Sequence, residues 1–127
     1  MKKKLKKNKI ILTRDGSHTI YNTEINECYH SIHGSINEAQ HVFIKNGLLA
    51  SSKKNINILE IGFGTGLNTL ITAQEAVKKN IKVNYHTIEN NPIREREYTQ
   101  LNYSKLLKLK NQELLKIHQS QWNLKVP

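Results

Sequence analysis

The sequence predicts a mixed α/β fold, in which an N-terminal β-hairpin precedes one β-strand–α-helix–β-strand unit with parallel strands. The hairpin is indicated by the turn dipeptide Asp15-Gly16, which lies between two short runs rich in β-branched residues. The unit is indicated by the apolar run at 56–61 and by the glycine-rich turn at 62–66, which leads into a segment with helical periodicity. A length of 127 residues suits one domain.

Residues 10–55 are expected to form an extension ahead of the parallel unit. The lysine-rich stretch 1–9 is predicted to be a disordered basic arm. The strands of the hairpin are predicted over residues 10–13 and 19–21, and the polar stretch 22–34 is predicted to be mostly loop.

A helix is predicted after this loop, ending at Gly47, because glycine is a common residue just past a helix. Ser35 and Glu38 have the spacing of a capping box, with Ser35 as the N-cap and Glu38 at the third helical position. A polar linker is expected at 51–55. The apolar positions expected to face the core are Ile36, Ala39, Val42 and Phe43.

Residues 56–127 are predicted to be part of a parallel-sheet domain. A buried strand is predicted over 56–61, a helix over 67–79 and a second strand over 81–88, which makes one right-handed unit. The helix residues expected to face the sheet are Leu67, Leu70, Ile71 and Val77.

Two more helices are predicted after the second parallel strand. Asn91 would cap the first, with Pro92 at its first position, and the second would span 104–119. A doubly wound sheet would need its third strand after Pro127, so we expect the chain to be truncated. The apolar stripe of the second helix is Tyr103, Leu106, Leu107, Leu114 and Ile117.

The composition favours a polyanionic partner such as RNA, because the formal net charge is +10. An AT-rich genome would also enrich lysine, and both interpretations stay open. The single cysteine, Cys28, cannot form an internal disulfide, which suits a reducing cytoplasm. No apolar run is long enough to span a membrane. Cys28 and the nearby histidines have no common zinc spacing, so no metal is expected.

The glycine turn is the strongest indication of a binding site. Glycine lacks a Cβ atom, so Gly62, Gly64 and Gly66 allow a sharp turn and a close approach by a ligand. The following helix would add free N–H groups. A dinucleotide site has the pattern G-x-G-x-x-G, and here the third glycine comes one residue early. Glu89 ends the second strand, where a carboxylate can accept hydrogen bonds from both ribose hydroxyls of either cofactor class.

The pattern E-x-G-x-G-x-G, beginning at Glu60, resembles the first motif of class I (Rossmann-like) S-adenosylmethionine-dependent methyltransferases. A narrower resemblance covers about residues 10–92. The chain resembles the MnmC-type methyltransferase domain family, which includes the stand-alone MnmD proteins. The segments that carry this resemblance are Asp15-Gly16-Ser17-His18-Thr19, Glu27-Cys28-Tyr29-His30-Ser31, Gly34, Glu38, His41-Val42-Phe43-Ile44 and Gly62-Phe63-Gly64-Thr65-Gly66-Leu67-Asn68.

The resemblance implies methylation of the aminomethyl group on the wobble uridine of certain tRNAs, with S-adenosylmethionine as cofactor. It also implies a FAD-dependent oxidase, on a separate protein or domain, that acts on the same nucleotide. Tyr29, His30 and Ser31 would lie near the substrate. The residues expected to bind the cofactor are Glu60, Gly62, Phe63, Gly64, Thr65, Gly66, Asn68 and Glu89.

No catalytic residue can be assigned from the resemblance. The family places an aspartate after its fourth strand, and the only aspartate here, Asp15, lies in the predicted hairpin turn. We therefore expect the N-terminal, cofactor-binding part of such an enzyme, without activity of its own. Two alternatives stay open: a dinucleotide-binding oxidoreductase and a non-catalytic RNA-binding remnant.

Overall fold

Within residues 7–125, which the computed structural model describes, the strands form two separate sheets. The N-terminal sheet is antiparallel and pairs Ile10 with Ile20, which confirms the predicted hairpin. The stretch expected to be loop supplies a third short strand. Asn8 and Lys9, assigned above to the basic arm, lie in the first strand, and residues 1–6 are outside the described part. The strands are β1 (Asn8–Leu12), β2 (His18–Asn22) and β3 (Glu27–Cys28).

The hairpin turn caps the first helix, α1 (Ser35–Ala39). Three side-chain oxygens of the turn accept hydrogen bonds from successive N–H groups at the start of this helix. The bonds run from Ser35 to Thr13 Oγ1 (3.2 Å), from Ile36 to Ser17 Oγ (3.2 Å) and from Asn37 to Asp15 Oδ2 (2.9 Å). These N–H groups have no partner within a helix, so the turn replaces a local cap.

The predicted capping box was therefore wrong. Gly34 is the N-cap residue, and a Cβ atom there would lie 2.8 Å from Asp15 Oδ2. Glu38 accepts a hydrogen bond from the N–H of Ser31 (3.2 Å) instead of closing a box. Only a residue without a side chain lets the aspartate approach this close.

A π-helical turn follows α1 and changes which face is buried. The wider turn, η1 (Gln40–Lys45), shifts the helix register, so Ile44 and Leu48 are buried. Val42 and Phe43, which we expected in the core, are 48% and 46% exposed. The helix ends before Gly47 as predicted, and the short helix η2 (Leu48–Ala50) leads to the second sheet.

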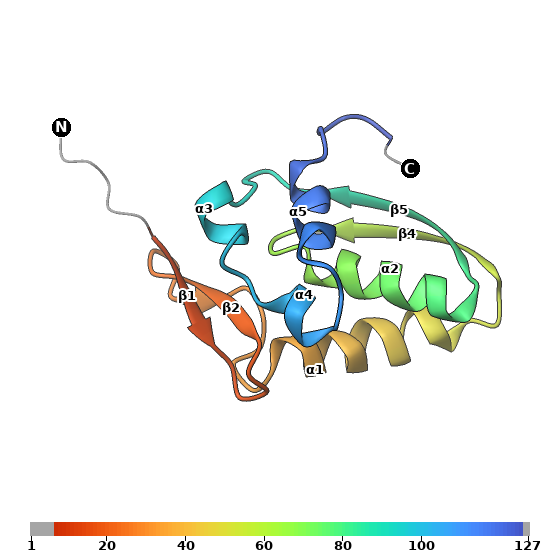
Figure 1. Ribbon diagram of the computed structural model, residues 1–127, viewed down its shortest axis with the longest axis horizontal. Helices are drawn as coiled ribbons and strands as arrows, with labels where there is room; N and C mark the ends of the chain where they lie inside the picture. Colours follow the sequence, from red (N-terminus) through yellow and green to blue (C-terminus); the bar gives the residue numbers. More distant parts are fainter. Residues whose placement is uncertain (1–6, 126–127) are drawn as a thin grey trace.

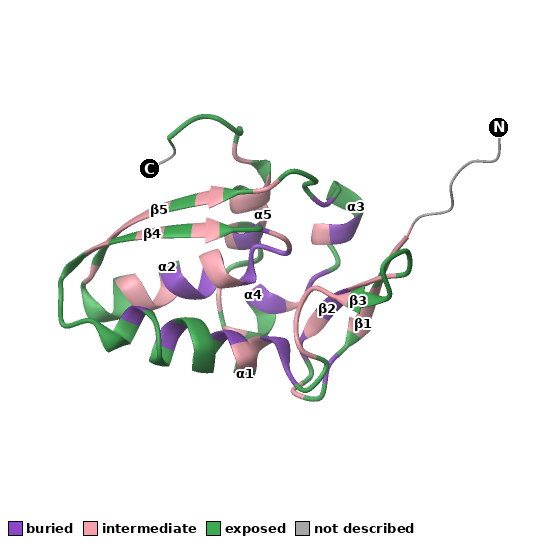
Figure 2. Cartoon of the chain, turned by 180° about the vertical axis from the view of Figure 1, so that it is seen from behind, coloured by how far each residue is buried: buried purple, intermediate pink, exposed green. Residues whose placement is uncertain are grey.

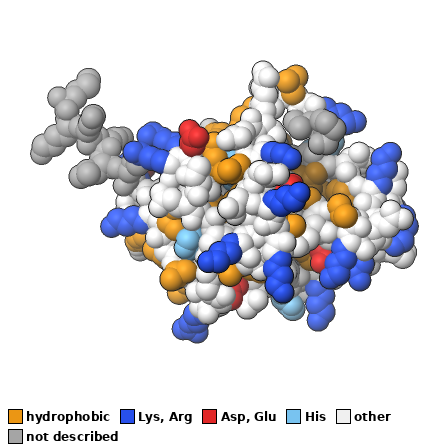
Figure 3. Space-filling model, in the orientation of Figure 1, with side chains coloured by type: hydrophobic (Ala, Val, Ile, Leu, Met, Phe, Trp, Pro, Cys, Tyr) orange, Lys and Arg blue, Asp and Glu red, His pale blue; other side chains and the backbone are white. Residues whose placement is uncertain are grey.

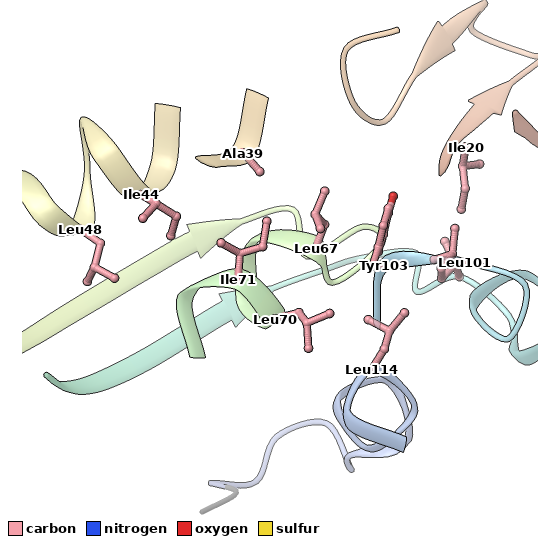
Figure 4. Close-up of a cluster of buried hydrophobic side chains, with 11 residues drawn as sticks. Ile20, Ala39, Ile44, Leu48, Leu67, Leu70, Ile71, Leu101, Tyr103 and Leu114 are labelled. Atoms are coloured by element: carbon pink, nitrogen blue, oxygen red, sulfur yellow. The ribbon is translucent and has the colours of Figure 1, made fainter. Parts of the chain in front are cut away.

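The second sheet contains the predicted parallel unit, formed by β4 (Asn55–Ile61), α2 (Leu67–Lys79) and β5 (Lys82–Ile88). The two strands pair in parallel, with Ile58 opposite Tyr85, which confirms a mixed α/β fold with a parallel sheet. Leu67, Leu70 and Ile71 of α2 are buried in the core, and Figure 4 shows Leu70 directed toward Leu114 of α5 and not toward the sheet. Val77 is 85% exposed, so its predicted place against the sheet was wrong.

The C-terminal region contains three short helices in place of the predicted two. Asn91 and Pro92 do not begin a helix, and Arg94 precedes the first one. The predicted helix at 104–119 is broken at Lys108, whose φ is 57°. Of the expected stripe, Tyr103 and Leu114 are buried, whereas Leu106 is 43% exposed. The helices are α3 (Glu95–Tyr98), α4 (Tyr103–Leu106) and α5 (Asn111–Gln119).

One hydrophobic core joins the two sheets and the C-terminal helices. Figure 4 shows Ile20 of β2, the inner side chains of α2, Tyr103 of α4 and Leu114 of α5 directed into the same space. Asn102 links the C-terminal region to the hairpin, because it donates to Gly16 O and accepts from the N–H of His18, both at 2.9 Å.

The parallel sheet has one covered and one open face. Helix α2 lies against one face, with α1 beyond it, and α5 stands at the end where both strands finish (Figure 1). Along β4, exposed and partly buried residues alternate (Figure 2). Leu59, Ile61 and Ile88 are 65%, 74% and 56% exposed on the open side. The side chains of Ile61 and Ile88, the last residues of β4 and β5, are thus accessible on the open face next to the glycine turn.

Candidate functional site

The glycine loop, residues 62–66, connects β4 to α2, and all three of its glycines have φ angles in the left-handed region. Their φ angles are 88° at Gly62, 55° at Gly64 and 76° at Gly66. The N–H of Gly62 donates to the carbonyl oxygen of Ile88 at 2.7 Å, which attaches the loop to the end of β5. A Cβ atom on Gly62 would meet nothing within 4 Å, so this glycine borders open space.

Glu89 closes the loop from the second strand. Its Oε2 accepts a hydrogen bond from the N–H of Gly64 at 2.9 Å, and its Oε1 accepts one from the N–H of Asn91 at 3.0 Å. A carboxylate has about four acceptor positions, so two remain for a ligand. The structure therefore brings together the loop and the acidic residue that the spacing predicted.

Glu60 and Asn68 lie on the covered side of the sheet. Glu60 Oε1 accepts hydrogen bonds from the hydroxyls of Thr87 (2.8 Å) and Thr69 (3.4 Å). Burial raises the pKa of Glu60, although the bond from Thr87 opposes this. Asn68 Oδ1 is buried and has no hydrogen-bond partner. Both residues and Gly62 line a cavity of about 410 Å³, so a polar ligand group in it would find an acceptor ready.

Two of the three residues predicted near the substrate contact the loop. A Cβ atom on Gly64 would lie 3.1 Å from Tyr29 Cδ2, so the Tyr29 ring covers this glycine. His30 Nε2 lies 2.6 Å from Thr65 Oγ1. Burial lowers the pKa of His30, with Glu38 acting against the shift, so the neutral ring is favoured. Ser31 is not brought to the loop, and its N–H bonds to Glu38.

Phe63 and Thr65 offer a ligand little beyond their backbone, because both side chains are buried. Phe63 packs edge-on against His118 and Trp122, with ring centroids 5.0 and 5.7 Å away. The loop therefore has an inner side held by protein and an outer side made of Gly62 and Glu89, with Gly64 beneath the Tyr29 ring.

His118 of α5 is a site residue that the sequence reasoning did not identify. Its Nε2 lies 2.7 Å from the carbonyl oxygen of Thr65. Burial lowers the pKa of His118, and the bond to Thr65 opposes the shift. Its position four residues after the buried Leu114 was the one available signal, since both lie on the inner face of α5.

The described residues 7–125 contain no group of three or more histidine, cysteine or acidic side chains able to hold a metal ion. In the same range, no helix has the length and apolar character needed to cross a membrane.

The curated proteins that resemble this chain in sequence are MnmC proteins. No family model matches the chain. The tRNA 5-methylaminomethyl-2-thiouridine biosynthesis bifunctional protein MnmC of Leptospira interrogans (strain Fiocruz L1-130) is 32% identical over 114 residues, which are 82% of this chain and 18% of that protein. MnmC of Cupriavidus metallidurans is 42% identical over 67 residues, which are 50% of this chain and 10% of that protein.

A solved structure agrees with the sequence relatives. The crystal structure of MNMC2 from Aquifex aeolicus superposes with a TM-score of 0.58 at 25% identity. The match covers 83% of this chain and 38% of that one. The chain is related to MnmC. This MnmC-related chain spans 18% or less of the length of the curated MnmC proteins it matches.

Proposed function

We propose that this MnmC-related chain forms the S-adenosylmethionine-binding part of a tRNA methyltransferase. The observation that carries the proposal is the hydrogen bond from Gly64 N–H to Glu89 at the carboxyl ends of two parallel strands. In open parallel sheets, ligands bind at this end of the strands. The unit β4–α2–β5 would then be the first βαβ unit of a class I, Rossmann-like methyltransferase fold, with the N-terminal sheet as its extension.

The residues present fit this cofactor. Glu89 has acceptor positions left for the two ribose hydroxyls, and Gly62 has open space where a side chain would stand. Glu60 and the unpartnered Oδ1 of Asn68 suit the ammonium end, because both are acceptors in a partly enclosed cavity. The N–H groups of Gly62, Gly64 and Gly66 all donate to acceptors within the protein, which agrees with a cofactor that has no pyrophosphate.

The proposed substrate is the 5-aminomethyl group of the wobble uridine in tRNA, which would become 5-methylaminomethyl. S-adenosylmethionine would supply the methyl group, and the primary amine would attack it in line. The loop, Glu89 and Tyr29 would hold and orient the cofactor. Orienting the reactants is the largest contribution expected of the protein in such a transfer. No residue of the chain is assigned as the base that removes the proton of the amine.

The charge of the chain supports an RNA substrate. Lys and Arg side chains are spread over the face in Figure 3, with few Asp or Glu side chains between them. The formal net charge of +10 would draw tRNA toward the protein at low salt. The family's FAD-dependent oxidase step is proposed to belong to a separate protein or domain, and the methyl transfer to take place in the cytoplasm.

Equilibrium dialysis of the full chain against S-adenosylmethionine and against NAD tests the cofactor. We expect S-adenosylmethionine to bind more tightly. Glu89→Gln should weaken it about tenfold or more, because a charged acceptor is lost. The exposed Glu95→Gln in α3 is the matched control and should leave binding unchanged.

Tighter binding of NAD would contradict the proposal and would indicate a dinucleotide-binding oxidoreductase. If the chain binds tRNA in a salt-dependent way but binds neither cofactor, the result would indicate a non-catalytic RNA-binding protein.

A further inference from the structure

Thr65, the fourth of the five residues of the glycine loop, is held from two sides by histidines that lie outside the β4–α2–β5 unit. His118 of α5 contacts its carbonyl oxygen at 2.7 Å. His30, from the segment between β3 and α1, contacts its Oγ1 at 2.6 Å. Thr65 itself is fully buried.

The chemistry of the contact settles which nitrogen of His118 carries the proton. A carbonyl oxygen only accepts hydrogen bonds, so His118 Nε2 must be the donor. The ring is fixed in the orientation this needs, since it stacks on Tyr98 with centroids 4.5 Å apart and planes 8° from parallel. Phe63 packs edge-on against another side of the same ring, at 5.0 Å.

Fixing this carbonyl fixes the peptide that joins Thr65 to Gly66, because a peptide group is planar. The N–H of Gly66 then points to the carbonyl oxygen of Phe63, to which it donates at 3.0 Å. Glycines gain the most conformational freedom when they are released, and three of the five loop residues are glycines. The loop thus depends on an external contact to keep one shape.

The fit around Gly66 is close enough to make the contact specific. A Cβ atom on Gly66 would lie 3.0 Å from His118 Nε2 and 3.0 Å from Phe63 Cζ. Glycine at this position therefore makes room for the histidine, in addition to allowing the backbone to turn.

We propose that His118 is a positioning residue, whose Nε2–H donates to Thr65 and holds the glycine loop in the shape that binds the cofactor. His30 supports Thr65 as well, through a contact with the Thr65 hydroxyl. The part of this inference that concerns cofactor binding rests on the proposed function. Binding at the loop then depends on the docking of α5, which contacts the loop through His118.

Two variants of His118 separate the hydrogen bond from ring packing. In His118→Gln, the amide nitrogen is as many bonds from Cα as Nε2 is in histidine, so the donor is kept. His118→Asn carries the same amide one bond short. Both variants lose the ring, and with it the stack on Tyr98, to the same extent.

The measurements are the Kd for S-adenosylmethionine and the hydrogen-exchange rates of the Gly64 and Gly66 amides in the full chain. His118→Asn should weaken cofactor binding about tenfold and speed exchange by a similar factor, which is the effect of one buried hydrogen bond. His118→Gln should recover most of both. Circular dichroism should show the same helix content in both variants.

Equal effects of the two variants, or none from either, would overturn the inference. If the parent chain binds no S-adenosylmethionine, the proposed function fails, and the exchange rates alone decide whether His118 holds the loop. If His118→Asn does not fold, the long-range ¹H–¹⁵N spectrum of the parent decides. It must show His118 Nε2 as the protonated nitrogen at neutral pH, and protonation at Nδ1 would contradict the proposal.

Discussion

Asp15, the only aspartate of the chain, has a structural role at the start of α1. Its Oδ1 accepts hydrogen bonds from the Ser17 backbone (3.0 Å) and hydroxyl and from Thr13 Oγ1 (2.9 Å), and its Oδ2 accepts one from the Asn37 N–H (2.9 Å). Burial would raise the pKa of Asp15, but these bonds together lower it below its usual value. Four hydrogen bonds from the hairpin turn and α1 thus hold this carboxylate in place, which argues against a catalytic role.

Asp15→Ala should lower the free energy of unfolding by about 0.5–2 kcal/mol, the range measured for lost helix caps. Because the folded pKa lies below the unfolded one, the stabilisation is present above about pH 4 and is lost as the pH falls through the folded pKa. Urea unfolding at pH 7 and pH 3 measures this. Asp15→Asn is the control, since it cannot titrate, and its difference from the parent should shrink at pH 3. A difference that does not change with pH would contradict this account.

The two faces of β4 differ in what they contribute to stability. Leu70 of α2 is 2% exposed in the hydrophobic core against which Ile56 and Ile58 of β4 pack, whereas Ile61 on the open side is 74% exposed. Burial of apolar surface provides most of the stabilisation of a fold, so only the covered side should be sensitive to truncation.

Leu70→Ala should lower the free energy of unfolding by about 2–5 kcal/mol, and Ile61→Ala should change it by about 0.5 kcal/mol or less. Urea unfolding of the two variants, followed by circular dichroism, gives both values. A loss for Ile61→Ala as large as for Leu70→Ala would mean that the open face is covered in solution.

Elements defined by local patterns could be predicted from the sequence, and elements defined by distant contacts could not. The strand–helix–strand unit has its own periodicity and glycine turn, and the predicted helix matches α2 at both ends. The cap of α1 comes from a turn about 20 residues earlier, which no local pattern indicates. The π-helical turn and the left-handed Lys108 after α4 were likewise not indicated by the sequence pattern.

At the scale of the whole molecule, the candidate site combines segments that are far apart in the sequence. Tyr29 and His30 reach the glycine loop from the N-terminal extension, Glu89 from the end of β5 and His118 from α5. The loop and Glu89 were predictable because their spacing follows the geometry of one strand–helix–strand unit. The contact of His118 was not, because it requires α5 to pack across the end of the sheet (Figure 1).

Two glycines allow a direct test of whether the outer side of the glycine loop receives S-adenosylmethionine. Gly62 and Gly16 have φ angles of 88° and 83°, and a Cβ atom on either would meet nothing within 4 Å. Alanine should therefore strain both backbones equally, by about 1–2 kcal/mol. Calorimetric titration of both variants with S-adenosylmethionine separates this strain from ligand contact. Gly62→Ala should weaken binding at least about tenfold, and Gly16→Ala, in the hairpin turn, should not. Parental affinity in both variants would contradict the proposal.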